Sequence, residues 1–180
     1  MRGGRRPLPR GTVVALDIIP FEPVPNAICL PEVDILTNEC STQLQAVLTT
    51  LDVAGESQTG NKGIDVVLSD MAPSATGNKD MDHDNVVKLC YAALTLGLHH
   101  LSVGGTFLCK LWNGWRTQGL YDDLRKLFKT VRYVKPPASR NDSAEIYLLA
   151  QDFVGVKGLG QARTTQTEQA ITADANRDSR

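Results

Sequence analysis

The sequence has no long apolar run and no excess of charge of either sign. Its 180 residues contain 19 lysines and arginines against 20 aspartates and glutamates, for a formal net charge of -1. This balance provides no global attraction to a polyanion, so any such partner must be recognised by local basic patches. No apolar stretch approaches the roughly 18 residues that a membrane-spanning helix needs, and we expect no membrane segment.

Cysteine and histidine are sparse and irregularly spaced. The 4 cysteines contain no C-x-x-C pair, and the 3 histidines supply no regular ligand spacing. A zinc site needs such spacing, so we expect no metal site. Cys29 and Cys109 lie in apolar, strand-like runs, which indicates reduced thiols within a core.

The chain is organised around Ile64–Pro73, an apolar run that ends abruptly in an acid, small residues and a proline. The run predicts a parallel strand that is buried on both faces, with Asp70 at its carboxyl end. Ligands bind at the carboxyl ends of strands in open α/β sheets, which makes Asp70 a candidate for chemistry. The alternative is that Asp70 only caps the loop that follows.

A second apolar run, Thr12–Asp17, also ends in an acid. In nucleotide-binding α/β folds, an acid at this place accepts hydrogen bonds from the two hydroxyls of a ribose. A simple capping role for Asp17 has comparable weight.

The remaining patterns predict further strands and helices in alternation. We expect strands over residues 27–30, 106–112, 130–134 and 143–150, and helices over 40–51, 84–101 and 120–128, the second helix being stopped by Gly104-Gly105. The connection over 135–142 is too short for a helical crossover, so the last two strands should be antiparallel. Lys110 lies in an otherwise apolar strand, where a lysine needs a partner. The sequence therefore predicts one α/β domain with a mostly parallel sheet and an antiparallel final strand.

Four separated blocks carry a resemblance to a known family. They are Ser69-Asp70-Met71-Ala72-Pro73, Gly104-Gly105-Thr106-Phe107 leading to Lys110, Lys135-Pro136 with Ser139-Arg140, and Glu145-Ile146-Tyr147. In this order and spacing the chain resembles the FtsJ-type RNA ribose 2'-O-methyltransferases over about residues 11–153. The stretch from Asp70 to Asp84 is most similar to the mitochondrial members that modify large-subunit ribosomal RNA.

The resemblance implies a Rossmann-like sheet, S-adenosylmethionine as the cofactor, and a catalytic tetrad of Lys, Asp, Lys and Glu. Asp70, Lys110 and Glu145 match its last three members. Asp17 matches the acid that holds the ribose of the cofactor and Asp34 the acid near its adenine, while Asp70 also borders the cofactor. The implied partner is ribosomal RNA or the large ribosomal subunit.

Contacts to RNA should come from local basic and aromatic residues. The resemblance assigns Arg140 and Lys135 to the RNA, with support from a basic helix face around Arg125 and Lys129. Trp112 and Trp115 could stack on bases. The alternative is that Trp112 belongs to the core and the basic face is only solvated.

The ends of the chain depart from the family pattern. The family's first strand, its Gly-rich loop and the first tetrad lysine should lie upstream of residue 11, and the basic leader over 1–10 contains none of them. We therefore expect a sheet truncated at its first strand. Residues 154–180 have the composition of a disordered polar tail, and the resemblance implies a mitochondrial location.

Three interpretations stay open at this point. The first is an rRNA 2'-O-ribose methyltransferase that uses S-adenosylmethionine. The second is a catalytically inactive, truncated family member that at most binds RNA or a ribosome precursor. The third is a nicotinamide-dependent oxidoreductase on a similar sheet, which leaves Lys110 and Glu145 unexplained.

Overall fold

A computed structural model describes residues 11–53, 63–137 and 144–155. The expected basic leader, Arg140 and all of the expected tail beyond residue 155 lie outside the described residues. The chain divides into two compact units, Met1–Val53 and Ala54–Arg180, which are described one at a time. Among the residues described, no helix is long and apolar enough to cross a lipid bilayer.

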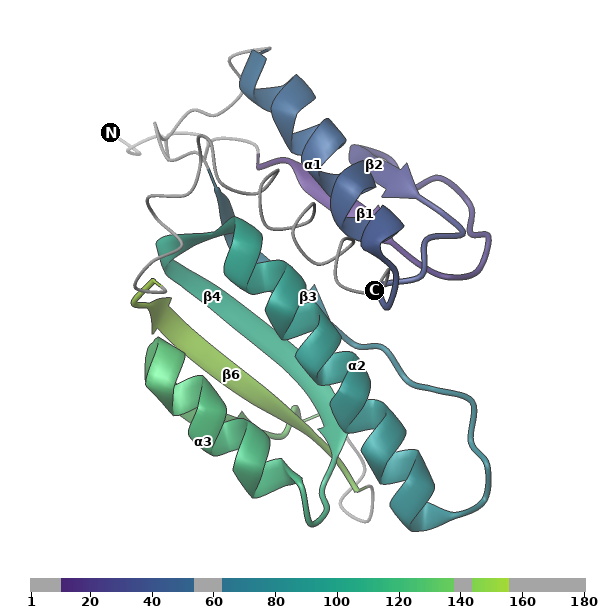
Figure 1. Ribbon diagram of the computed structural model, residues 1–180, viewed down its shortest axis with the longest axis vertical. Coiled ribbons are helices and arrows are strands. Elements are labelled where there is room, and N and C mark those ends of the chain that lie inside the picture. Colours follow the sequence, from purple (N-terminus) through teal and green to yellow (C-terminus); the bar gives the residue numbers. More distant parts are fainter. Residues whose placement is uncertain (1–10, 54–62, 138–143, 156–180) are drawn as a thin grey trace, which may run out of the picture. The chain divides into compact units, whose positions relative to one another are not determined.

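The first unit contains two parallel strands and one helix (Figure 1). Strand β1 (Val13–Leu16) pairs in parallel with β2 (Ala27–Leu30), from Val13 opposite Ala27 to Leu16 opposite Leu30. Helix α1 (Asn38–Val53) follows and buries Cys40 and Leu44. All three elements confirm the sequence prediction, and the helix begins two residues earlier than the expected 40.

The second unit is a four-stranded sheet with the order β3-β4-β6-β5. Its elements are β3 (Ile64–Ser69), α2 (Lys79–His100), β4 (Leu101–Trp112), α3 (Thr117–Leu127), β5 (Phe128–Val134) and β6 (Glu145–Phe153). Strand β3 is parallel to β4, whereas β6 runs antiparallel to both β4 and β5. The predicted antiparallel final strand is confirmed. In addition, β6 is inserted between β4 and β5, which no local pattern indicated.

The core of this unit lies between the sheet and the helices α2 and α3, which cover the same face (Figure 1). Every second residue of β4 is buried there, as Phe107, Cys109 and Leu111 are at most 1% exposed. Leu120 and Leu124 of α3 are 0% exposed. This alternation turns Lys110 to the opposite face of the sheet, because successive side chains of a strand point to opposite sides.

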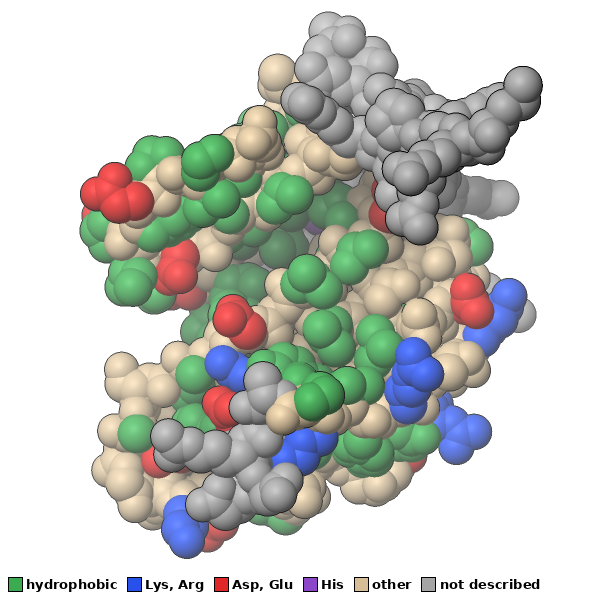
Figure 2. All heavy atoms as spheres, turned by 180° about the vertical axis from the view of Figure 1, so that it is seen from behind, with side chains coloured by type: hydrophobic (Ala, Val, Ile, Leu, Met, Phe, Trp, Pro, Cys, Tyr) green, Lys and Arg blue, Asp and Glu red, His purple; other side chains and the backbone are tan. Residues whose placement is uncertain are grey.

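Strand β3 is less buried than its apolar sequence indicates. The prediction of a strand covered on both faces is wrong: Val66 is 50% and Leu68 71% exposed. Within its sheet β3 is an edge strand, and only the side facing α2 is covered, where the Val67 side chain lies 3.7 Å from a Cβ built on Gly97. The other face of the sheet is seen in Figure 2, where hydrophobic side chains lie among basic and acidic ones.

The expected helix stop is wrong, and so is the expected start of the next strand at 106, since β4 begins at Leu101. Helix α2 ends at His100, and Gly104-Gly105 lies inside β4 instead of stopping the helix. The ladder jumps from Ile64 opposite Leu101 to Val66 opposite Thr106, and Gly104, with φ +85, belongs to the irregular segment between these pairs. A positive φ suits glycine in a bulge as well as in a helix cap, so the sequence alone could not separate the two.

The start of α2 at Lys79, five residues before the expected start at 84, is explained by helix capping. Helix α2 begins at Lys79 because the Asn78 side chain accepts hydrogen bonds from the backbone N–H groups of Asp80 and Met81.

Two further expectations concern single residues. Lys129, expected on a basic helix face, lies in β5. The cysteines are free thiols, of which Cys29 is half-buried and the other three are buried.

The packing of α3 on the sheet generates a stability prediction. Leu124→Ala should lower the free energy of unfolding by about 2–5 kcal/mol, because it removes a fully buried side chain and leaves a cavity. Arg125→Ala on the exposed side of the same turn should change it by less than about 0.5 kcal/mol. Urea unfolding of both variants measures the difference, and equal midpoints would contradict this account of the core.

Candidate functional site

The carboxyl end of β3 lies beside the part of β4 that contains Lys110. Ser69 is the last residue of β3 and stands opposite Cys109 in the parallel ladder. The next positions along the two chains are Asp70 and Lys110, so the acid directly after β3 is level with the lysine of β4. Asp70 is exposed and Lys110 half-buried.

Glu145 reaches the same edge from the antiparallel strand. It is the first residue of β6 and lies opposite Trp112, while Lys110 lies opposite Tyr147. Lys110 and Glu145 are therefore diagonal neighbours on one face of the sheet, a relation in which side-chain positions are about 7–8 Å apart and long side chains can meet. The fold thus gathers two carboxylates and one lysine from three strands at one edge.

The expected RNA-binding residues are only partly described. Val134, the last residue of β5, lies opposite Tyr147, so Lys135 leaves the sheet at the edge where Glu145 enters it. Arg140 lies outside the described residues. Trp112 is half-buried and Trp115, in the loop after β4, is 65% exposed.

The two acids expected near a cofactor lie close together in the first unit. The carbonyl oxygen of Asp17 accepts a hydrogen bond of 2.8 Å from the N–H of Val33, the residue before Asp34. The Asp17 carboxylate accepts from the N–H of Ile19 at 3.1 Å, and that of Asp34 from the N–H of Leu36 at 2.9 Å. Both acids thus lie just beyond the carboxyl ends of the parallel pair β1 and β2.

The loop that follows Asp70 is held by an acid that the sequence analysis did not single out. Asp82 Oδ1 accepts hydrogen bonds from the N–H of Thr76 at 2.7 Å and from its hydroxyl at 2.6 Å, and Oδ2 accepts from the N–H of Gly77 at 3.3 Å. These bonds, that of the Thr76 hydroxyl first, lower the pKa of Asp82. The signal available in the sequence was the helix-capping residue Asn78, which would have placed Asp82 in the first turn of α2, a short distance after a Thr-Gly pair.

A sheet whose strand ends present carboxylates and a lysine at one edge is the arrangement of a ligand-binding α/β enzyme. Comparison with known families agrees with this class. Residues 4–153 match the description FtsJ-like methyltransferase. The chain belongs to the FtsJ-like methyltransferase family.

Individual relatives are similar over most of the chain. The chain is 43% identical over 145 residues to the ribosomal RNA large subunit methyltransferase E of Parvibaculum lavamentivorans, covering 81% of the chain and 52% of that protein. It is 40% identical over 145 residues to the protein of the same name from Wolbachia pipientis, covering 81% and 68%. The chain thus spans about half to two thirds of the length of these curated relatives.

A solved structure supports the same fold. The crystal structure described as a ribosomal RNA methyltransferase from Plasmodium falciparum superposes with a TM-score of 0.65 at 25% sequence identity, over 80% of this chain and 73% of that one. The expected Rossmann-like α/β class is confirmed.

The bonds of Asp82 generate a pH prediction. Asp82→Asn should lower the melting temperature at about pH 7, because an amide cannot accept from all three donors. The folded pKa of Asp82 is depressed, so its contribution to stability is present above the ordinary aspartate pKa of about 3.9 and is lost as pH falls through the folded value. Melting temperatures of wild type and variant should therefore converge in acid.

Asp80→Asn is the matched control, since Asp80 is an exposed acid in the same first helical turn. It removes the same charge from the helix start without touching the loop. If Asp80→Asn lowers the melting temperature as much as Asp82→Asn does, the effect comes from the helix dipole and not from the loop.

Proposed function

We propose that this chain carries the catalytic part of an enzyme that transfers a methyl group from S-adenosylmethionine to a ribose 2'-hydroxyl of large-subunit ribosomal RNA. The observation that carries the proposal is the convergence of Asp70, Lys110 and Glu145 at one edge of the sheet. The names of the relatives support ribosomal RNA as the substrate, and the family supports methyl transfer.

The proposed reaction needs alignment more than it needs a strong nucleophile. Transfer of a methyl group to a hydroxyl is an in-line displacement, in which the hydroxyl oxygen attacks from the side opposite the leaving group, the leaving group keeps the electron pair of the broken bond, and the hydroxyl proton is released to solvent water. A lysine between two carboxylates is well suited to hold that oxygen, because its three donors can be shared between the acids and the hydroxyl.

Each residue takes a role that follows from its place. Lys110 orients the hydroxyl and stabilises negative charge as it develops on the oxygen. Glu145, diagonal to it on β6, positions the ammonium group. Asp70, level with Lys110 at the end of β3, positions it from the other side, and the resemblance assigns Asp70 to the cofactor as well.

The donor set of the first unit fits the proposed cofactor. S-adenosylmethionine, when bound, supplies an electrophilic methyl group on a positively charged sulfur. Asp17 and Asp34 are acceptors placed beyond parallel strand ends, and each uses one carboxylate oxygen for a local N–H. A carboxylate offers about four acceptor positions, so capacity is left for the ribose hydroxyls at Asp17 and for the adenine end at Asp34.

The substrate contacts and the cellular location are further parts of the proposal. Lys135 leaves the sheet beside Glu145, where a phosphate next to the target ribose could be bound, and the resemblance assigns Arg140 to the same task. We also propose a mitochondrial location, for which the likeness of the stretch from Asp70 to Asp84 to the mitochondrial members is the support. Fractionation of the source cells tests it, and recovery outside mitochondria would overturn it.

The proposed roles separate catalysis from cofactor binding. In the full-length protein, Lys110→Ala should lower the rate of methyl transfer by at least about 100-fold while S-adenosylmethionine affinity stays nearly unchanged. Asp17→Ala should weaken cofactor binding about tenfold or more, through loss of a charged hydrogen bond of roughly 1.5–3 kcal/mol. Glu145→Ala should resemble Lys110→Ala in a milder form.

Single-turnover methyl transfer to a ribosomal-subunit substrate, beside a separate calorimetric titration of the cofactor, measures both effects. Asp70→Asn should also lower the rate of methyl transfer, because it removes one of the two carboxylates that position Lys110. Asp65→Asn is its control and should leave the rate nearly unchanged, because Asp65 is an exposed acid near the start of β3 and away from its carboxyl end. Full activity of Lys110→Ala would overturn its catalytic role, and unchanged cofactor affinity of Asp17→Ala would overturn the ribose contact.

A further inference from the structure

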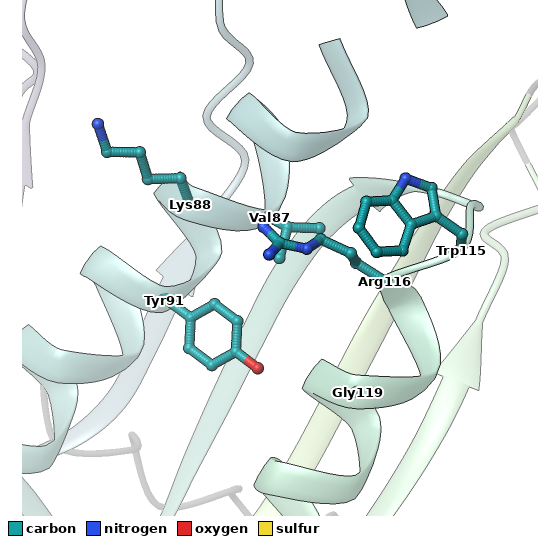
Figure 3. A pocket seen from close by; sticks show the side chains of 6 residues that line it. All are labelled: Val87, Lys88, Tyr91, Trp115, Arg116 and Gly119. Carbon is teal, nitrogen blue, oxygen red and sulfur yellow. The ribbon is translucent and has the colours of Figure 1, made fainter. Parts of the chain in front are cut away.

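A groove lies between α2 and α3, on the face of the sheet opposite to Lys110. It has a volume of about 520 Å³, within the range of small-ligand sites. Figure 3 shows the residues that line it: Val87, Lys88 and Tyr91 from α2, Trp115 and Arg116 before α3, and Gly119 from α3.

Trp115 forms one end of the groove, and its indole ring is not packed into the core. Its side chain is 65% exposed, although tryptophan is usually buried to a large extent. The guanidinium group of Arg116 lies 5.0 Å from the centre of its ring, and the ring of His83 lies 6.4 Å away at 52°. An exposed indole next to an arginine is the combination on which unpaired nucleic-acid bases stack.

Residues of α2 hold the loop after β4, which contains Trp115 and Arg116. The backbone N–H of Arg116 donates to His83 Nε2 at 3.0 Å, and the Arg116 guanidinium pairs with Asp84 at 3.6 Å. Both side chains of that pair are about half exposed, at 49% and 45%. The pair uses Nε of Arg116, so the two terminal nitrogens of the half-exposed guanidinium group are available to donate to a phosphate.

Positive charge also lies on the outer side of the groove. Lys88 is exposed and extends from α2 toward solvent, away from Trp115 (Figure 3). On the inner side, the Tyr91 hydroxyl donates to Asp123 at 2.7 Å, and Asp123 is also bound by Lys126. Burial, followed by this bond to Asp123, raises the pKa of Tyr91 to about 12, so its ring is a neutral wall of the groove at physiological pH.

The floor of the groove is open at Gly119. A Cβ built on this helical glycine meets no atom within 4 Å. A glycine costs a helix about 1 kcal/mol relative to alanine. The backbone of α3 is thus open to the groove at a position where a side chain would have improved the helix.

We propose that this groove binds an unpaired nucleotide of the RNA substrate, with its base stacked on Trp115 and its phosphates near Arg116 and Lys88. The inference rests on the proposed function, since it takes RNA as the substrate. Trp115 follows Lys110 by five residues, so their Cα atoms are at most about 17 Å apart. An RNA strand that places a ribose at Lys110 can pass over the loop after β4 and enter the groove near the target nucleotide.

Filling the groove tests the proposal without weakening the fold. Gly119→Leu should project a side chain into the open space and lower the affinity for a short, fluorescein-labelled, mixed-sequence RNA oligonucleotide by about tenfold or more. Gly119→Ala is the control at the same position: it should raise the melting temperature through helix propensity and leave RNA affinity within about twofold. Fluorescence anisotropy of the full chain measures both.

The stacking and the charge contacts are tested one by one. Trp115→Ala should weaken RNA binding by about 5- to 100-fold, as expected for loss of one stacked base. Arg116→Ala should reduce the salt dependence of binding by about 0.7 in the logarithmic slope, the value for one phosphate of a single strand. Arg132→Ala on β5 removes the same charge from outside the groove and should have a smaller effect.

The outcomes of these experiments distinguish a failure of the groove proposal from a failure of the proposed function. Normal RNA affinity in both Gly119→Leu and Trp115→Ala would overturn the groove proposal, even if wild type methylates RNA. Groove-dependent binding with no methyl transfer by wild type would overturn the proposed function and keep the groove. An equal loss in Arg116→Ala and Arg132→Ala, tighter binding of an RNA duplex, or no RNA binding by wild type would each contradict a site for an unpaired nucleotide.

Discussion

The site depends on the two different pairings of β4. Its parallel ladder with β3 sets Asp70 level with Lys110, and its antiparallel ladder with β6 places Glu145 diagonally across from the same lysine. Strand ends from opposite chain directions therefore meet at one edge of the sheet. A shift of one residue in either ladder would turn the acid to the other face, because side chains alternate along a strand. The buried residues Phe107 and Leu111 on the helix side make such a shift costly.

The helix side supports this edge in a second way. Helix α2 starts directly after the loop that follows Asp70, and its first turns provide Asp82 to hold that loop and His83 to hold the loop after β4. Both loops leave the same edge of the sheet. One short stretch of helix thus fixes the loop at Asp70 and the loop that carries Trp115. Under the two proposals, this stretch connects the reacting ribose with a nucleotide bound farther along the strand.

Much of the secondary structure, and the places of two acids at strand ends, could be predicted from local patterns. Short apolar runs that end in Asp17 and Asp70 predicted strands with functional ends, and the short link after Val134 predicted an antiparallel partner. The patterns failed where two structures use the same signal. Gly104 was expected as a helix stop and is part of an irregular strand, and the polar residues before Asp84 hid the first turn of α2, which Asn78 caps.

The sequence by itself determined the alternation of strands and helices and the acids that stand at strand ends, because these depend on neighbours a few positions apart. Only the tertiary structure decided that β6 inserts beside β4, which faces of β3 are covered, and that Trp115 stays exposed above a groove. Those features arise from contacts between segments distant in the chain, such as Arg116 with His83 and Tyr91 with Asp123, and no local period of hydrophobicity encodes them.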